Sequence, residues 1–347
     1  MLENIKVSPG PHISKHISTR TVMIDVIIGL FPAMLAACYF FRFDAVRLIA
    51  TCVLSCMATE LACTLIRKKK SSLDDFSAMI TGIILALSLP ASLPTWAAII
   101  GSVFCIAIAK MVFGGLGSNV FNPAMVGRAF MAACFGTLMT VWTIPATIDQ
   151  SMPKLSPQGI VAKTTFSSEE TIQAITTATP LSWVKDSLKK KVPAVEIYDK
   201  QLKAMCLGET AGCLGETSTI AIIIGGIYLL IRKTITYHTP LAVIVGAFAF
   251  ALIGHMISPD TFVNPVVHLA AGGLMLCAFF IATDPVTAPL TKKGMWLFGI
   301  GVGMFIMLIR TFGAYPEGVM YAVLLMNSLT PLIDRLFKLV PVGGKNA

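Results

Sequence analysis

The chain has 347 residues, of which 55% are hydrophobic and only 13% charged, with a formal net charge of +9 at pH 7. Soluble domains carry about 25% charged residues, so this composition excludes an ordinary soluble protein and predicts a polytopic membrane protein. The basic excess does not indicate nucleic-acid binding, because the Lys and Arg residues flank apolar segments, where they set membrane topology.

A membrane-spanning helix needs about 20 predominantly apolar residues. Residues 1–21 are polar and lack the apolar core and cleavage site of a signal peptide, so the first span is expected to stay in the membrane. The sequence therefore predicts an all-α polytopic membrane protein with ten transmembrane helices. In chain order these are residues 22–41, 45–66, 76–89, 95–113, 123–142, 218–231, 239–257, 266–282, 295–311 and 317–337.

The Lys and Arg residues fix the orientation of these spans. Most of those outside the long polar segment 143–217 fall on one side of the membrane, which the positive-inside rule makes the cytoplasmic side. The exceptions are Arg42, Arg47 and Arg310. Both the amino-terminal segment (1–21) and the carboxy-terminal tail (338–347) are therefore expected in the cytoplasm, and residues 143–217 outside.

An internal repeat divides the membrane part into two halves, residues 22–142 and 218–337. The third and eighth spans both end in Pro-x-x-x-Pro, at Pro90 and Pro94 and at Pro285 and Pro289. Five spans per half is an odd number, so the halves should be inverted, as in urea-transporter-like folds. Matched broken spans in such proteins meet near the membrane midplane and line an internal site. The alternative interpretation is that these prolines only stop helices.

Ionisable residues in or beside the spans are expensive if they face lipid, so they are expected to face protein or water. These residues are Glu60, Arg128, His268 and Asp284. Of these, Arg128, His268 and Asp284 form the candidate internal polar site. Asp284 has the alternative role of capping the end of the eighth span. The sequence contains no Ser/His/Asp set, paired loop carboxylates or zinc-ligand spacing, so we expect neither catalytic residues nor a metal site in this chain.

Two features of the segment 206–218 bear on its structure. Cys206 and Cys213 occur in a near-duplicated stretch, and the sequence leaves open whether they pair. Glu216-Thr217-Ser218 precedes an apolar run and predicts a capped helix start.

Several motifs spread along nearly the whole chain are specific in combination. They resemble the D subunits of Rnf-type ion-translocating electron transport complexes, which are homologous to the B subunit of the sodium-pumping NADH:quinone reductase. The motifs are Ser8-Pro9-Gly10-Pro11-His12-Ile13, Gly114-Gly115-Leu116-Gly117, Phe121-Asn122-Pro123-Ala124-Met125-Val126-Gly127-Arg128, Leu214-Gly215-Glu216-Thr217-Ser218, Thr283-Asp284-Pro285-Val286-Thr287 and Ile309-Arg310-Thr311-Phe312-Gly313-Ala314-Tyr315-Pro316-Glu317-Gly318-Val319.

The resemblance implies an FMN esterified through its phosphate to a threonine in the outward loop. The family pattern is Asp-x-x-Ser/Thr-x-Ala-Thr, and its last threonine corresponds to Thr179 here. Gln173 stands where the family has aspartate, and Thr176 and Thr177 are minor alternative acceptors. The resemblance also implies a second flavin, riboflavin, held non-covalently between the helices by residues that the sequence does not identify.

The function implied by the resemblance is electron transfer between ferredoxin and NAD, coupled to Na⁺ or H⁺ translocation. The chain would be one subunit of this oxidoreductase complex in a bacterial or archaeal cell membrane, without a complete active site of its own. Its expected partners are the other membrane and peripheral subunits, including a second subunit with covalent FMN, a flavin transferase for maturation, and the lipid bilayer. The alternatives are a solute channel or carrier and the quinone-reductase homologue.

Overall fold

The computed structural model describes residues 18–68, 72–143, 207–208, 212–257, 264–313 and 317–338. Within these ranges the chain is helical, and its one β-type pairing is an isolated bridge between Pro90 and Cys213. Five helices are long and apolar enough to cross a membrane, which confirms the prediction of a polytopic, all-helical membrane protein. They are α1 (Thr19–Phe41), α2 (Phe43–Ile66), α10 (His238–Ile257), α13 (Lys292–Phe312) and α14 (Val319–Leu336).

Shorter elements complete the described fold. Three are apolar helices of intermediate length: α3 (Ser77–Leu87), α4 (Thr95–Ile106) continued by the π-helical turn η2 (Ala107–Met111), and α9 (Thr219–Ile231). The others are η1 (Leu73–Asp75), α5 (Pro123–Cys134), α6 (Gly136–Met139), η3 (Leu214–Glu216), α11 (Pro265–Ala270), α12 (Leu274–Leu276) and the π-helical turn η4 (Cys277–Ile281).

Side-chain caps explain where several helices begin. In α1, α5, α9 and α13 the residue before the helix accepts a hydrogen bond from the backbone N–H three positions on, which satisfies one of the unpaired amides of the first turn. Ser218 is the cap of α9, as the sequence predicted. The capping residues are Ser18, Asn122, Ser218 and Thr291.

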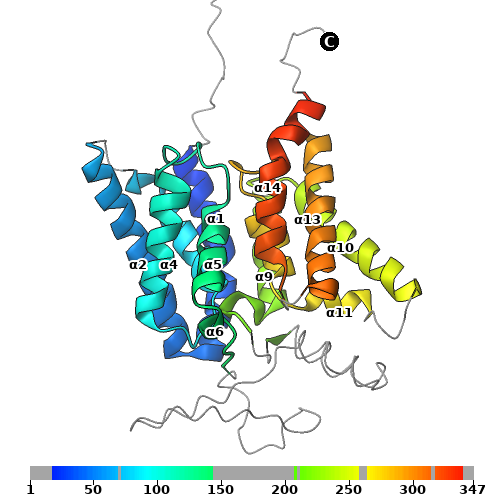
Figure 1. The fold of residues 1–347 in the computed structure, drawn as a ribbon, viewed down its shortest axis with the longest axis horizontal. Helices are drawn as coiled ribbons and strands as arrows, with labels where there is room; N and C mark the ends of the chain where they lie inside the picture. The colour runs from blue at the N-terminus through cyan, green and yellow to red at the C-terminus, as the bar shows by residue number, and fades with distance from the viewer. Residues whose placement is uncertain are drawn as a thin grey trace, which may run out of the picture.

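The helices form two groups that lie side by side (Figure 1). The first group runs from α1 to α6 and the second from α9 to α14; α1 packs against α9 and α5 against α14 across the boundary. The start of α1 and the end of α14 lie at the same end of the molecule, which we call the terminal face. We call the opposite end, where α6 and α11 lie, the far face.

Glycines set how closely these helices approach. A Cβ added to Gly225 of α9 would lie 1.9 Å from the backbone oxygen of Gly29 in α1, and one added to Gly303 of α13 would lie 2.3 Å from the oxygen of Val243 in α10. Membrane helices gain little from hydrophobic burial and associate through close van der Waals packing, which small residues permit. The contact between the two groups of helices therefore depends on the absence of a side chain at Gly225.

The eighth expected span, residues 266–282, is not one continuous helix. It is broken between α11 and α12, where Ala271 is extended and Gly272 has a φ of +66°. The Gly272-Gly273 pair explains the break, because glycine adopts such conformations without strain and is a weak helix former. The fifth expected span, 123–142, also ends early: α5 stops at Cys134, and the short helix α6 follows.

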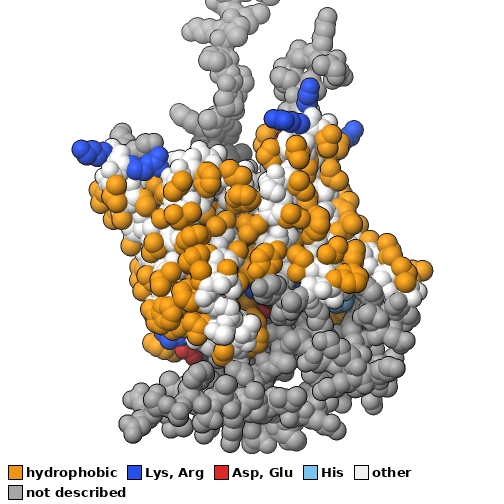
Figure 2. All heavy atoms as spheres, viewed as in Figure 1, with side chains coloured by type: hydrophobic (Ala, Val, Ile, Leu, Met, Phe, Trp, Pro, Cys, Tyr) orange, Lys and Arg blue, Asp and Glu red, His pale blue; other side chains and the backbone are white. Residues whose placement is uncertain are grey.

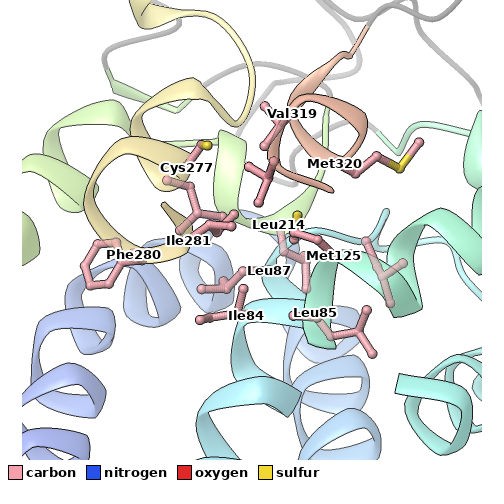
Figure 3. Close-up of a cluster of buried hydrophobic side chains, with 14 of the residues drawn as sticks. Ile84, Leu85, Leu87, Met125, Leu214, Cys277, Phe280, Ile281, Val319 and Met320 are labelled. Carbon is pink, nitrogen blue, oxygen red and sulfur yellow. The ribbon is translucent and has the colours of Figure 1, made fainter. Parts of the chain in front are cut away.

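Hydrophobic side chains cover the flank of the molecule, with Lys and Arg gathered at the edge of the terminal face (Figure 2). The inside is apolar as well. Ile84 and Leu87 of α3, Leu214 of η3, and Phe280 and Ile281 of η4 meet in one buried cluster between the two groups of helices (Figure 3).

Candidate functional site

A cavity of about 280 Å³, which we call the inner cavity, lies between the two groups of helices. Its walls combine α1, α3, the segment before α5, α9, η4 and the segment after η4. The third and eighth expected spans therefore both line it, through α3 and η4. The polar and aromatic side chains in the lining are Ser77, Thr81, Lys110, Asn119, Asn122, Phe279, Phe280, Thr283 and Asp284.

Polar groups at the inner cavity are few and specific. The Asn119 side chain is buried, and its Oδ1 has no hydrogen-bond partner among the described residues. Asn122 uses its Oδ1 to accept from the Met125 amide at 3.3 Å, and its Nδ2 lies 3.5 Å from the Ile281 oxygen. A largely apolar cavity with a few placed polar groups is typical of small-molecule and cofactor sites.

Asp284 lines the inner cavity and also caps the turn that follows it. Its Oδ1 accepts from the Val286 amide at 3.2 Å, and its Oδ2 accepts from the Thr287 hydroxyl at 3.1 Å. The two roles weighed for this residue are therefore compatible: the capping bonds orient the carboxylate at the edge of the cavity.

Lys110, on the π-helical turn η2, is almost fully buried and lies in an ion pair. Its Nζ donates to Oε2 of Glu60 at 2.8 Å and to the Ser77 hydroxyl at 2.6 Å. The Lys110 and Glu60 side chains are 2% and 0% exposed. Sequence reasoning counted Lys110 among the basic residues on the cytoplasmic side and missed this pair. The signal that could have revealed it is that the fourth expected span, 95–113, includes Lys110.

A second hollow, which we call the vestibule, opens beside the inner cavity and has a volume of about 360 Å³. Thr19 at the start of α1 and Arg67 at the end of α2 place it on the terminal face. Ser72, Asp75 and Leu116 also line it, and Leu116 is shared with the inner cavity.

A charged cluster lies toward the far face, where the two groups of helices meet. Arg128 of α5 donates to Oε2 of Glu317, which precedes α14. Its Nη2 lies 3.9 Å from Oε1 of Glu216 in η3 and 3.3 Å from the Cys213 sulfur. All four residues are buried. Cys213 is a free thiol, and Cys206 lies outside the described residues.

This cluster has the composition of a metal site but already contains a cation. Ligand atoms of Cys213, Glu216 and Glu317 all lie within 4.8 Å of one another. The guanidinium of Arg128 contacts these same groups, so a side chain supplies the positive charge that two buried carboxylates need. We interpret the cluster as a buried ion-pair network that links the two groups of helices.

The predicted polar residues do not form one site. The inner cavity includes Asp284 in its lining but neither Arg128 nor His268. His268 of α11 is buried, with no partner for either ring nitrogen among the described residues; its backbone oxygen accepts from Arg310 at 2.8 Å. Thr179 lies outside the described residues, so the flavin attachment stays a prediction.

Comparison with known proteins covers nearly the entire chain. The model of the NQR2, RnfD, RnfE family matches residues 6–343. The D subunit of the Na⁺-translocating ferredoxin:NAD⁺ oxidoreductase complex of Acetobacterium woodii is 39% identical over 337 residues, which cover 96% of this chain and 94% of that protein.

Two further relatives have similar coverage. The D subunit of the proton-translocating ferredoxin:NAD⁺ oxidoreductase complex of Clostridium ljungdahlii is 38% identical over 345 residues, covering 98% of this chain and 96% of that protein. The D subunit of the ion-translocating oxidoreductase complex of Cronobacter sakazakii is 36% identical over 339 residues, covering 95% and 96%. The chain therefore belongs to the NQR2, RnfD, RnfE family.

Proposed function

We propose that this chain is the D subunit of an ion-translocating ferredoxin:NAD⁺ oxidoreductase complex and that it carries electrons within the membrane. The observation that supports this most directly is the full-length similarity to D subunits of such complexes. A protein that carries electrons must bind redox cofactors and hold them in position. It does not need acid–base or nucleophilic residues of its own, and the sequence shows no motif for such residues.

FMN bound covalently to Thr179 is the first element of this proposal. Its support is the pattern Thr176-Thr177-Ala178-Thr179 in the long polar segment. A phosphoester tether would stop loss of the flavin to the outside medium. The experiment is intact-mass measurement of the purified chain together with ultraviolet fluorescence of the denatured band. We expect a mass increase of one FMN less one water, which Thr179→Val should remove.

Two control variants make this experiment specific. Thr176→Ser keeps the family pattern and Thr177→Val removes a hydroxyl outside it, and both should leave the flavin in place. A Thr179→Val chain that still fluoresces after denaturation would show that another residue carries the flavin. A variant with Gln173→Asp restores the family pattern, and its flavin content compared with the wild type measures how much the glutamine impairs attachment.

Riboflavin in the inner cavity is the second element. The cavity walls are largely apolar, and the unpartnered Asn119 oxygen and the second N–H of the Asn122 amide would make hydrogen bonds to the polar edge of a flavin ring. Phe279 and Phe280 lie on the same wall and suit a flat aromatic ring. When bound, a flavin would supply a carrier that accepts two electrons and passes them singly. Asn119→Ala should reduce the non-covalent flavin extracted by acid and leave the covalent flavin unchanged.

The membrane arrangement is the third element. We propose ten spans in two inverted five-helix halves, with both termini in the cytoplasm of a bacterial or archaeal cell and residues 143–217 outside. The paired contacts α1–α9 and α5–α14 between the two groups support this arrangement, because corresponding elements of inverted halves meet at a pseudo-two-fold axis. The terminal face would then be the cytoplasmic face.

Coupling to ion movement and assembly with partners complete the proposal. The complexes of the two relatives are named as sodium- and proton-translocating, at 39% and 38% identity, so similarity does not select Na⁺ or H⁺ for this chain. The partners are the other membrane and peripheral subunits, a second subunit with covalent FMN, and the flavin transferase. Electron transfer in vesicles, with and without Na⁺ and a protonophore, identifies the ion.

A further inference from the structure

The ion pair between Lys110 and Glu60 lies between two hollows of the structure. Lys110 and its partner Ser77 line the inner cavity, whereas Ser72 and Asp75 line the vestibule. Glu60 lines neither hollow and is fully buried. A buried ion pair adds little stability over a well-packed apolar pair, so fold stability alone does not account for charges at this position.

Two hydrogen-bonded routes join the vestibule to Lys110. In the first, Ser77 Oγ lies 2.5 Å from Asp75 Oδ1 and 2.6 Å from Lys110 Nζ. In the second, Ser72 Oγ lies 2.5 Å from Glu60 Oε1, and Glu60 Oε2 lies 2.8 Å from Lys110 Nζ. Each step joins two groups in direct hydrogen-bond contact, and every residue on both routes carries an exchangeable proton or accepts one.

We propose that Lys110 is the end of a proton relay that connects the vestibule with the inner cavity. This inference rests on the proposed function, in which a redox group that takes up protons occupies the inner cavity. The protons are those of the redox reaction itself, and they enter from the terminal face. Among the described residues that line the inner cavity, Lys110 is the one basic side chain.

The transfer steps balance without any oxidant or reductant beyond the electrons that the complex delivers. The Lys110 ammonium releases one proton from Nζ into the inner cavity as negative charge builds up there. Asp75, whose carboxylate accepts a hydrogen bond from Ser77, takes up a proton from a hydronium ion in the vestibule. The Lys110 amine then takes the proton of the Ser77 hydroxyl, while Ser77 takes the new proton from the Asp75 carboxyl, which returns to a carboxylate. The loss of charge at Lys110 leaves Glu60 buried and unpaired, and this drives reprotonation.

The other charged groups around the relay do not replace Lys110. Arg67 lines the vestibule, and its Nη1 donates to the Met111 oxygen at 2.7 Å, but a guanidinium does not release its proton in proteins. Arg20 of α1 lies over the Phe76 ring at 5.3 Å and touches neither route. Asp284 faces the inner cavity from the second group of helices and accepts hydrogen bonds from its own turn.

The substitution Lys110→Arg separates a relay from a structural ion pair. Arginine keeps the charge beside Glu60 but does not give up a proton, whereas Lys110→Met removes both properties. The complete complex is purified with each variant, and its flavin content is measured. Proton uptake is then followed with a pH-indicator dye after photochemical reduction of the bound flavin, in H₂O and in D₂O.

We expect both variants, per bound flavin, to take up protons at least tenfold more slowly than the wild type, since positioned proton donors contribute about 10²–10⁴-fold. Wild-type uptake should show a solvent isotope effect. Wild-type rates in Lys110→Arg, with normal flavin content, would overturn the relay. Absence of non-covalent flavin from the wild-type complex would instead overturn the proposed cofactor.

A second readout does not depend on flavin. Dicyclohexylcarbodiimide enters apolar regions and modifies protonated carboxyl groups, so Glu60 should react in Lys110→Met and stay unreactive in the wild type and in Lys110→Arg, as read by peptide mass. Equal labelling in the wild type and Lys110→Met would show that Lys110 does not hold Glu60 ionised, and would overturn the network. If Lys110→Met does not fold, the double variant Glu60→Leu/Lys110→Met removes both charges and should show the same slow uptake.

Discussion

Removal of the Arg128 guanidinium should destabilise the protein strongly, because Arg128 ties the two groups of helices together. Its partners Glu317 and Glu216 have side chains that are only 11% and 8% exposed. Breaking a buried pair by removing one partner costs about 3–5 kcal/mol, since the other charge is left uncompensated. Two carboxylates lose their cation in Arg128→Leu, so we expect a loss near the upper end, about 4–5 kcal/mol.

Reversible unfolding in mixed detergent–SDS micelles measures this free energy for Arg128→Leu, Glu317→Gln and the double variant. The double variant should lose less than the sum of the single variants by about 1–3 kcal/mol, which is the coupling expected of residues in contact. Asp44→Asn is a matched control, because its exposed ion pair with Arg47 is worth about 0–1 kcal/mol. Two results would show that Arg128 does not link the two groups of helices. One is a double variant whose loss of unfolding free energy equals the sum of the single losses, and the other is a loss below about 1 kcal/mol in Arg128→Leu.

Three further predictions test other parts of the molecule. Gly225→Val should destabilise the contact between α1 and α9 by several kcal/mol in the same unfolding assay, whereas Gly136→Ala should not, because a Cβ at Gly136 meets no atom within 4 Å. A cysteine at Lys163 should react with an impermeant thiol reagent on intact cells; labelling only in inverted vesicles would contradict an outward segment 143–217. Asp284→Asn should leave flavin attachment at Thr179 intact but lower ion-coupled electron transfer, and full coupled activity would leave Asp284 only its capping role.

Hydropathy predicted most helix positions well because long apolar runs leave the chain little choice in a membrane. The expected span 22–41 corresponds to α1, and 295–311 corresponds to α13. The errors occur where a local conformation overrides hydropathy. The eighth expected span is apolar throughout, yet the Gly272-Gly273 pair breaks it, and the prediction gave more weight to the prolines that follow.

The candidate site was predicted less completely than the fold. Asp284 was singled out for its position after a broken span, and it does line the inner cavity. Asn122 was known only as part of a motif, and nothing in the spacing of Asn119 and Asn122 shows that α3 and η4 would meet them. Pairing between residues far apart in sequence, such as Glu60 with Lys110, depends on helix packing that periodicity does not encode.

Among the described residues of the first group of helices, two basic side chains are buried, and their acidic partners are synthesised at different times. Glu60 precedes Lys110 by 50 residues, so the pair is complete as soon as the fourth span has been synthesised. Glu317 follows Arg128 by 189 residues. At 5–20 residues per second the ribosome needs about 10–40 s to reach it. Until Glu317 is made, Arg128 has at most its longer contact of 3.9 Å with Glu216, and a charge paired so incompletely is costly in a membrane. Membrane insertion of this protein must therefore keep α5 near water or near the insertion machinery until α14 emerges.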